Sequence, residues 1–294
     1  MGLKIHSAPS LRERTTLHLG GTALAEICLN DVRELDALPA ELDRLGGTPL
    51  MLGKGSNILA ADGELPYALV RVPSPGKPEV VAERGDKVTV RAEAGMGLPA
   101  FLSWCAGKGL SGAEGLMGVP GKLGGAVAMN AGSYGVCMAD LMRRVLVFSP
   151  CCGLRWVSRD DVLTGYRFFA PRTFDHWFLV LAAELDMERG TSELIRERMA
   201  EHRDTKRRTQ PVEAWSAGCT FRNPEGISAG KLLDDAGFRG KKCGGMEFST
   251  KHANFLVNTG AGTSDQALEL IAEAQQTVQR LYGIELELEV KVLS

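Results

Sequence analysis

The chain lacks the features that mark several large protein classes. It has no run of 18 apolar residues, so we expect no membrane-spanning helix. Its first residues, MGLKIHS, lack the long apolar core of a signal peptide, so none is expected. The formal net charge is only −2, with 24% charged residues, which argues against a nucleic-acid-binding protein. No internal repeat or low-complexity segment is visible.

Metal-binding cysteine patterns are also missing. The chain has seven cysteines, an odd number, and the only close pair is Cys151 and Cys152. There is no Cys-x-x-Cys motif and no histidine near the cysteines at ligand spacing, so we expect no zinc or iron–sulfur site. A reduced cytoplasmic protein is the simplest interpretation.

Glycine, in contrast, is abundant, at 35 of 294 residues against an average of roughly 7%. Residues 112–135 read GAEGLMGVPGKLGGAVAMNAGSYG, and such a segment can bind a diphosphate through main-chain N–H groups. The alternative is a surface linker, but linkers are polar, whereas this segment carries interleaved Leu, Met and Val and is expected to be buried. A second glycine loop, GKGSN at 53–57, follows an apolar run, an arrangement common at phosphate sites, but it has neither P-loop nor dinucleotide-fold spacing.

A third informative segment, residues 215–224, reads WSAGCTFRNP. Cys219 follows two small residues that let a ligand approach the backbone, and a thiol can exchange a proton near neutral pH. From this segment alone, an inert buried cysteine is the commoner outcome.

Taken together and in order, these motifs resemble the UDP-N-acetylenolpyruvoylglucosamine reductase family, also called UDP-N-acetylmuramate dehydrogenases, in its shorter class. The resemblance runs nearly from end to end. It rests on the motifs TTLHLGG (15–21), GKGSN (53–57), GVPGKLGGAVAMNAG (118–132), GYR (165–167), TQP (209–211), SAGCTFRNP (216–224), SAGKL (228–232), KHANF (251–255) and LELEV (286–290).

The resemblance implies an α/β (α+β) fold: an FAD-binding domain like the vanillyl-alcohol-oxidase (PCMH-type) flavoproteins and a smaller α+β substrate domain. The basic stretch 203–208 before Pro211 is the best candidate for a boundary. We therefore expect an FAD-binding half at 1–205, with subdomains at about 1–60 and 61–205, and a substrate-binding domain at 206–294. The last strand, about 284–294, is expected to pack back on the FAD half.

Hydrophobic periodicity predicts individual elements. Helices are expected at 32–45, with Pro39 as a break, and at 98–107 and 192–207. A further helix is expected to open at a capping box, Thr263–Gln266, and to end at Gly283, with an apolar stripe of Leu268, Ile271, Val278 and Leu281. Strands are expected at 87–92, 144–148 and 178–185, and another around Glu285, Glu287 and Glu289.

The same resemblance implies the activity. FAD, bound non-covalently, is reduced by NADPH and passes hydride to UDP-N-acetylglucosamine enolpyruvate, and the enolate is then protonated to give UDP-N-acetylmuramate for peptidoglycan. Arg167 and Glu289 match the enolate-stabilising pair, and Cys219 the proton donor. Without the resemblance, Arg167 and Glu289 would be ordinary surface residues, and spacing does not choose among the three glutamates. The protein is expected to be a bacterial monomer without metal, nucleic-acid or membrane partners.

Further residues match family ligand contacts. For FAD these are Gly53, Lys54, Gly55, Ser56, Asn57, Gly118, Val119, Pro120, Gly121, Gly124, Gly125, Ala126, Asn130 and Gly132. For the substrate they are Tyr166, Asn223, Arg239 and His252. Three positions depart from the family pattern: Cys219 replaces a common Ser, Phe168-Phe169 stands where a Ser is usual, and Lys54 replaces a Gly.

Two alternatives remain open. A flavoprotein oxidase or dehydrogenase acting on another alcohol would share only the FAD half, and the motifs between 216 and 258 argue against it. A catalytically inactive flavin- or nucleotide-binding module would not need Arg167, Cys219 and Glu289 together.

Overall fold

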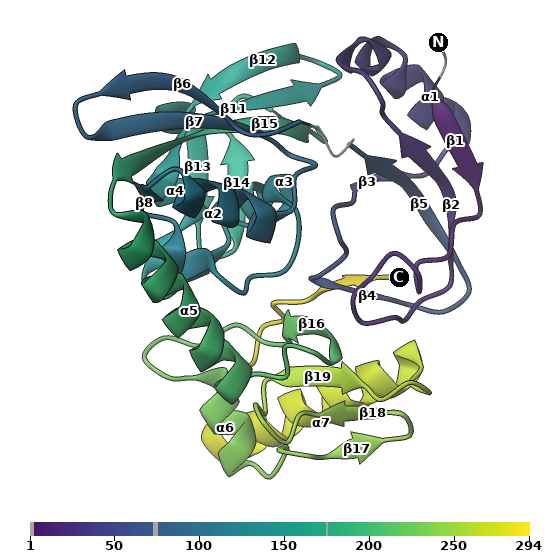
Figure 1. The fold of residues 1–294 in the computed structure, drawn as a ribbon. Coiled ribbons are helices and arrows are strands. Elements are labelled where there is room, and N and C mark those ends of the chain that lie inside the picture. The colour runs from purple at the N-terminus through teal and green to yellow at the C-terminus, as the bar shows by residue number, and fades with distance from the viewer. Residues whose placement is uncertain (1–2, 73–75, 175) are drawn as a thin grey trace. The chain divides into compact units, whose positions relative to one another are not determined.

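The computed structural model describes residues 3–72, 76–174 and 176–294, and the chain divides into two compact units (Figure 1). Unit 1 comprises Met1–Ile5, Glu26–Gly53 and Ala68–Thr205, and unit 2 comprises His6–Ala25, Lys54–Tyr67 and Lys206–Ser294. Each unit therefore contains segments that are far apart in the sequence. The expected domains are continuous, whereas these compact units are not, and the functional division at 205/206 stays a prediction.

The largest sheet of unit 1 is antiparallel and six-stranded. Its order is β12 (Gly153–Ser158), β11 (Met142–Ser149), β15 (Leu179–Arg189), β7 (Lys87–Glu93) and β6 (Glu79–Arg84), with β8 (Leu110–Ser111) also pairing with β15. In Figure 1 the helices α2 (Leu98–Gly107), α3 (Leu123–Ala128) and α4 (Met138–Leu141) lie together beside this sheet. Phe101, Val145 and Leu185 are fully buried in the shared core, so apolar burial holds these helices to the sheet.

Smaller elements complete unit 1. They are η1 (Val32–Asp36), α1 (Leu38–Leu45), η2 (Glu114–Leu116), β9 (Gly132–Ser133), β10 (Val136–Cys137), η3 (Arg159–Asp161), β13 (Val162–Gly165), β14 (Phe168–Pro171) and most of α5 (Ser192–Thr209). A four-stranded sheet has the order β1 (Lys4–Ser7), β2 (Thr22–Cys28), β5 (Glu64–Arg71) and β3 (Thr48–Met51), and the chain passes from one unit to the other within β1, β2 and β5.

Unit 2 contains a four-stranded antiparallel sheet and two helices. The strand order is β16 (Trp215–Cys219), β19 (Phe255–Asn258), β18 (Met246–Phe248) and β17 (Lys242–Cys243), with helices α6 (Ala229–Asp235) and α7 (Ser264–Tyr282). The last strand, β20 (Lys291–Leu293), pairs in parallel with β4 (Ile58–Ala60). Phe221, Phe238 and Phe248 are fully buried and pack against one another as aromatic neighbours.

The expected helices are confirmed where a proline or a capping residue sets their ends. Helix α2 has the expected bounds, and Pro39 lies in the first turn of α1, just after the break between η1 and α1. The Thr263 capping box and the left-handed Gly283 delimit α7.

Two expectations about the C-terminal elements are wrong. The side chain of Leu281 is 53% exposed, because the buried face of α7 is made largely of Ala267, Leu270 and Ala274. The second error concerns Glu285, Glu287 and Glu289, which precede the last strand, because that strand begins only at Lys291. Between residues 285 and 290, the backbone pairs with another segment through an isolated β-bridge from Leu288 to Phe221.

Candidate functional site

The glycine-rich segment of unit 1 is held close to the six-stranded sheet by its own backbone. A Cβ atom on Gly124 would lie 2.6 Å from the Cβ of Ala94, so only glycine fits there. The Gly124 N–H donates to the Ala94 carbonyl (2.9 Å), and the Leu123 N–H donates to the Met96 carbonyl (2.8 Å). Gly125 is exposed, with no atom within 4 Å of the place of a Cβ. The segment is thus rigid on one side and accessible on the other, which suits main-chain recognition of an anion.

The remaining residues predicted for FAD in this segment have different environments. Gly118 and Gly121 have φ values of +80° and +128°, in the region that favours glycine, and Gly118 and Pro120 are exposed. Val119 is half-buried and packs on the core, and Ala126 is 7% exposed. Gly118 and Pro120 therefore lie where a ligand could reach them, whereas Ala126 is a packing residue.

Asn130 fixes the predicted catalytic Arg167 through a hairpin turn. The buried Asn130 donates from Nδ2 to the Gly165 carbonyl (2.9 Å), and its Oδ1 accepts from the Ala139 N–H (2.9 Å). Gly165 pairs with Phe168 across the β13–β14 hairpin, leaving Tyr166 and Arg167 as its turn. Asn130 is thus a positioning residue for that turn.

Arg167 itself has a left-handed backbone, with φ +55°, which is unusual for a residue with a side chain. Its Nη1 donates to the Gly132 carbonyl at 3.4 Å, and its guanidinium carbon lies 5.0 Å from the centre of the Tyr166 ring. Unit 1 therefore brings Arg167 and Tyr166 together with Gly132 at the end of the glycine-rich segment.

Lys122 is a cation in this region that was not among the predicted site residues. A Cβ on Gly53 would lie 3.6 Å from the Cβ of Lys122, so the two glycine segments meet here within unit 1. Burial, followed by the positive charge of Arg71, lowers the pKa of Lys122. Arg71 is paired with Glu26 at 3.2 Å, whereas no carboxylate among the described residues pairs with Lys122. A half-buried ammonium group without a counter-ion is suited to bind an anion.

The rest of the 53–57 loop belongs to unit 2. Gly55 has φ +63°, and a Cβ there would lie 2.3 Å from the Arg14 carbonyl oxygen, so glycine is required. Lys54 is exposed and Ser56 is half-buried. Asn57 donates from Nδ2 to the Glu289 carbonyl (3.0 Å), and its own carbonyl accepts from the Lys291 N–H (3.0 Å). Asn57 therefore fixes the backbone around Glu289.

Cys219 ends β16 after a bulge, in which Gly218 has φ +80°. The next residue, Thr220, donates its N–H to the Asn254 carbonyl (2.8 Å), and its carbonyl accepts from the Glu289 N–H (2.8 Å). Unit 2 therefore holds the Glu289 backbone against Thr220, the residue that follows Cys219. Both side chains are partly exposed.

Asn254 organises this region and was not predicted as a site residue, although it lies in the KHANF motif. It is 1% exposed; its Oδ1 accepts from the Phe221 N–H (2.9 Å) and its Nδ2 donates to the Phe221 carbonyl (2.8 Å). The side chain thus completes the hydrogen bonds of a fully buried residue two positions after Cys219. The available sequence signal was an Asn two positions after His252 and directly before an apolar strand.

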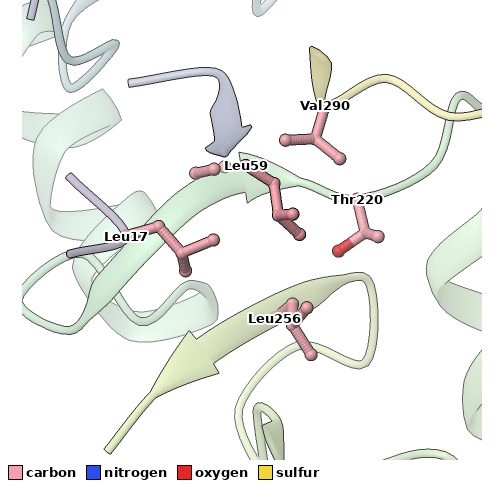
Figure 2. Close-up of a pocket in the computed structure, with 7 residues that line it drawn as sticks. Leu17, Leu59, Thr220, Leu256 and Val290 are labelled. Carbon is pink, nitrogen blue, oxygen red and sulfur yellow. The ribbon is translucent and has the colours of Figure 1, made fainter. Parts of the chain in front are cut away.

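A cavity of about 10 Å³ lies beside the bulge (Figure 2). Its walls are Leu17, Leu59, Ala217, Gly218, Thr220, Leu256 and Val290. This volume is at most enough for one water molecule, so the cavity is a packing gap and not a nucleotide site.

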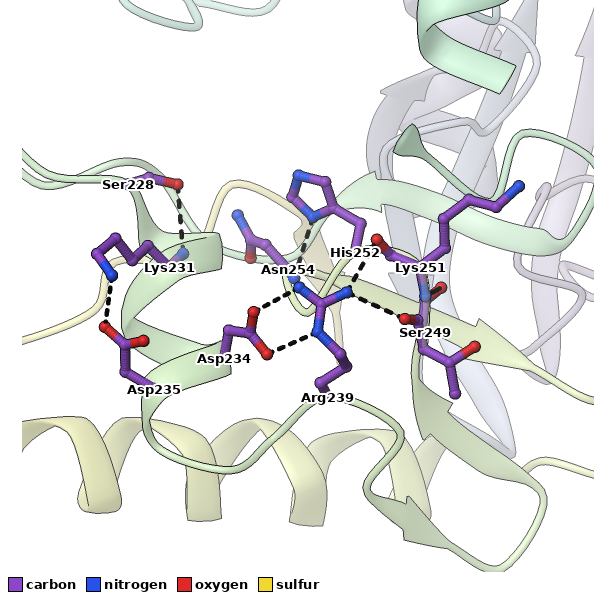
Figure 3. Close-up of polar contacts among 10 residues, drawn as sticks. Ser228, Lys231, Asp234, Asp235, Arg239, Ser249, Lys251, His252 and Asn254 are labelled. Atoms are coloured by element: carbon purple, nitrogen blue, oxygen red, sulfur yellow. Dashed lines mark hydrogen bonds and ion pairs between the residues drawn. The ribbon is translucent and has the colours of Figure 1, made fainter. Parts of the chain in front are cut away.

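The predicted substrate residues of unit 2 lie around α6. The Arg239 guanidinium pairs with both oxygens of Asp234 (2.6 and 2.5 Å) and donates to the carbonyls of Thr250 and Lys251 (3.0 and 3.1 Å), as Figure 3 shows. The hydrogen bond from Arg239 lowers the pKa of Asp234. Arg239 therefore links α6 to the 250–251 loop, and a substrate contact would use its remaining donor capacity.

His252 and Asn223 are placed differently. His252 Nδ1 accepts from the Asn254 N–H (3.2 Å), and a Cβ on Gly230 would lie 2.9 Å from the His252 ring. Burial, and next the Arg239 charge, lower the pKa of His252. Asn223 is exposed, and its Oδ1 accepts from the Ala229 N–H at the start of α6 (3.0 Å). The Asn223 amide NH₂ faces no partner among the described residues and remains available as a donor.

The described residues contain neither a metal-ligand cluster nor a membrane-spanning helix. Within residues 3–72, 76–174 and 176–294, no group of three or more His, Cys, Asp or Glu side chains is arranged to hold a metal ion. Among the helices of the same residues, none is both long and apolar enough to cross a membrane.

Comparison with known proteins identifies the relatives of both parts of the chain. Residues 23–151 match the family model of an FAD binding domain, and residues 210–293 match that of the UDP-N-acetylenolpyruvoylglucosamine reductase C-terminal domain. The reductase of Nitratidesulfovibrio vulgaris is 52% identical over 99% of both chains, and that of Syntrophomonas wolfei is 33% identical over 96% of this chain and 93% of its own. The crystal structure of the reductase from Thermus caldophilus superposes with a TM-score of 0.81 at 32% identity, covering all of both chains.

The fold, the FAD-binding match and the end-to-end similarity define an FAD-dependent oxidoreductase of mixed α/β fold. The chain belongs to the UDP-N-acetylenolpyruvoylglucosamine reductase family. It is therefore a UDP-N-acetylmuramate dehydrogenase, an oxidoreductase of peptidoglycan precursor synthesis that uses FAD with NADPH. The predictions of fold class, cofactor and enzyme class are confirmed.

Proposed function

We propose that, in the reduction of UDP-N-acetylglucosamine enolpyruvate to UDP-N-acetylmuramate, Cys219 is the proton donor and Arg167 and Glu289 stabilise the enolate. The observation that carries the proposal is the end-to-end family match together with the presence of all three residues. We further infer that the enzyme acts as a monomer in the bacterial cytoplasm, that 1–205 serves FAD, and that 206–294 serves the substrate.

The residues of the glycine-rich segment fit a diphosphate. The close approach of Gly124 to Ala94, the open position of Gly125 and the half-buried Lys122 give a rigid segment with exposed donors and one cation. We assign the diphosphate of FAD to these residues. When bound to these residues, FAD would supply the hydride chemistry that links NADPH to the enolpyruvyl group.

The protein's own chemical task is to stabilise negative charge and to deliver one proton. A guanidinium group at Arg167 provides a fixed positive charge for the carboxylate and developing enolate of the substrate. A thiol is intrinsically a stronger acid than the hydroxyl found in many relatives, and we assign the delivered proton to Cys219. The hydrogen bonds from Asn254 to Phe221, and from Glu289 to Thr220, hold the backbone on which Cys219 sits.

Lys122→Met is expected to weaken FAD binding by about 10- to 100-fold, because a charge-assisted contact is worth about 1.5–3 kcal/mol. Riboflavin, which has no diphosphate, should bind the variant and the wild type equally. Titration of the apoprotein by quenching of flavin fluorescence measures both ligands. Lys108→Met, at an exposed lysine of unit 1, is the matched control. An equal loss of FAD and riboflavin affinity would place Lys122 in a purely structural role.

Asn223→Asp is expected to raise the Michaelis constant for the enolpyruvyl substrate at least tenfold. The variant keeps an oxygen for the Ala229 N–H but replaces the amide donor with a negative charge, which repels a diphosphate. Thermal stability should therefore change little while substrate affinity falls. Steady-state kinetics with thermal unfolding of the same samples measure both, and an unchanged Michaelis constant would remove Asn223 from the substrate site.

All of the flavin is expected to be released when the purified yellow protein is precipitated with trichloroacetic acid. The candidate nucleophile Cys105 is 1% exposed, and burial raises its pKa to about 12, so it is a poor nucleophile for a covalent flavin bond. Absorbance of the supernatant and pellet provides the measurement. Flavin that stays with the precipitate would show a covalent link.

A further inference from the structure

Two adjacent thiols lie at the turn between β11 and β12 of unit 1. The Sγ atoms of Cys151 and Cys152 are 3.4 Å apart, and Cys151 is exposed while Cys152 is half-buried. Cys151 Sγ is also 3.3 Å from Ser149 Oγ, and Cys152 Sγ lies 3.9 Å from the Thr173 carbonyl oxygen. The two sulfur atoms are therefore already in contact at the surface of the unit.

The strands around the turn hold its ends in place. Ser149 pairs with Gly153, and the ladder continues without a shift to Arg144 and Ser158. Gly153, with φ +64°, closes the turn. A change in the bonding of the two thiols can therefore be confined to the short loop between Ser149 and Gly153.

Three of the other cysteines, Cys105, Cys137 and Cys243, have raised thiol pKa values and are therefore poor nucleophiles. Burial raises the pKa of Cys105 to about 12. Burial, followed by the hydrogen bond to Asp140, raises the pKa of Cys137. The hydrogen bond to Glu269 raises the pKa of Cys243. These three cysteines are thus less suited to thiol–disulfide exchange than the pair at the turn, whose sulfur atoms are already in contact.

We propose that Cys151 and Cys152 form a reversible dithiol–disulfide site that reacts with low-molecular-weight disulfides. One cysteine thiolate attacks the disulfide RS–SR and releases one RSH, which gives a mixed disulfide on the protein. The neighbouring thiolate then attacks the protein sulfur and releases the second RSH. Two cysteine thiols are oxidised to one disulfide, and one disulfide is reduced to two thiols.

The geometry of neighbouring residues makes this bond easy to reverse. Consecutive Cα atoms are about 3.8 Å apart across a trans peptide, whereas disulfides usually join Cα atoms at least about 4.4 Å apart. The resulting strain raises the reduction potential, which is typical of labile disulfides and not of structural ones. The site therefore responds to the thiol–disulfide balance of its surroundings without acting as a permanent crosslink.

The test uses the FAD-loaded protein and oxidised glutathione, followed by alkylation of free thiols and peptide mass analysis. The peptide that carries both cysteines should lose two hydrogen atoms. If this site reacts completely and no other cysteine reacts, the number of free thiols per chain should fall from seven to five. Dithiothreitol should restore them. Recovery of Cys151 and Cys152 as two separate glutathione adducts, or as unmodified thiols, would overturn the proposal.

A second probe distinguishes a dithiol from two independent thiols. Phenylarsine oxide condenses with two thiols to form a cyclic dithioarsinite and one water molecule. The wild type and Cys243→Ser should each bind one equivalent and protect both turn cysteines from alkylation. Cys151→Ser, at an exposed turn position, should retain the flavin spectrum but lose this binding. Undiminished arsenical binding by Cys151→Ser would assign the reactivity to other cysteines and contradict the proposal.

Discussion

Cys219→Ala is expected to slow reoxidation of the reduced enzyme by the enolpyruvyl substrate about 10²- to 10⁴-fold, the range that general acid catalysis typically provides. Reduction by NADPH should proceed at nearly the wild-type rate, because that half-reaction does not require protonation of the substrate carbon. Rapid mixing, followed by flavin absorbance, measures the two half-reactions separately. The split between them is the signature of a proton donor.

Cys219→Ser is the matched control for this prediction. A hydroxyl serves in many relatives, so the serine variant should recover much of the lost rate, although it is the weaker acid. If Cys219 only packs in the site, the alanine variant will be mildly affected and the serine variant no better. An alanine variant that reoxidises at the wild-type rate would transfer the role of acid to water or to Glu289.

Asn254→Ala is expected to lower the free energy of unfolding by about 2–5 kcal/mol. The change leaves the N–H and the carbonyl of Phe221 without their partners in a fully buried position, and each unsatisfied group costs roughly 1–3 kcal/mol. Because Phe221 follows Cys219 by two residues, the slow step of the Cys219 variants should also slow here. Denaturant unfolding and rapid mixing of the same variant measure the two effects.

Asn30→Ala provides the control for stability, because Asn30 is exposed and makes a single side-chain hydrogen bond, to the Cys28 carbonyl. We expect its effect to stay within about 0.5 kcal/mol. If Asn254→Ala were as mild as Asn30→Ala, the buried amide would not be what organises the backbone after Cys219.

The sequence was most informative where local chemistry decides the structure. The capping box at Thr263, the helix from Leu98 and the break near Pro39 all depend on neighbouring residues, and all three are confirmed. The family and cofactor could also be recognised, because glycine-rich motifs keep their order along the whole chain. By contrast, the exposed Leu281 was misassigned, since apolar spacing does not show that small alanines fill the buried face of α7.

The supporting residues of the site could not be found in this way, because their roles depend on tertiary contacts. Asn254 becomes important only when it meets Phe221, 33 positions earlier in the chain. Asn57 reaches the Glu289 backbone across 232 positions, and the position of Lys122 beside Gly53 likewise requires the folded chain. Arg239 looked like a ligand residue in the sequence, but its guanidinium is largely engaged by Asp234 and two carbonyls.

The most direct test of the proposed function follows the flavin colour of the wild-type protein without oxygen. NADPH should bleach the yellow protein, and UDP-N-acetylglucosamine enolpyruvate should then restore the colour with formation of one UDP-N-acetylmuramate per flavin. An oxidase of another alcohol would be bleached by that alcohol instead, and an inactive binding module would not be bleached by NADPH at all. Failure of the enolpyruvyl sugar nucleotide to recolour the NADPH-reduced protein would contradict the assigned reaction.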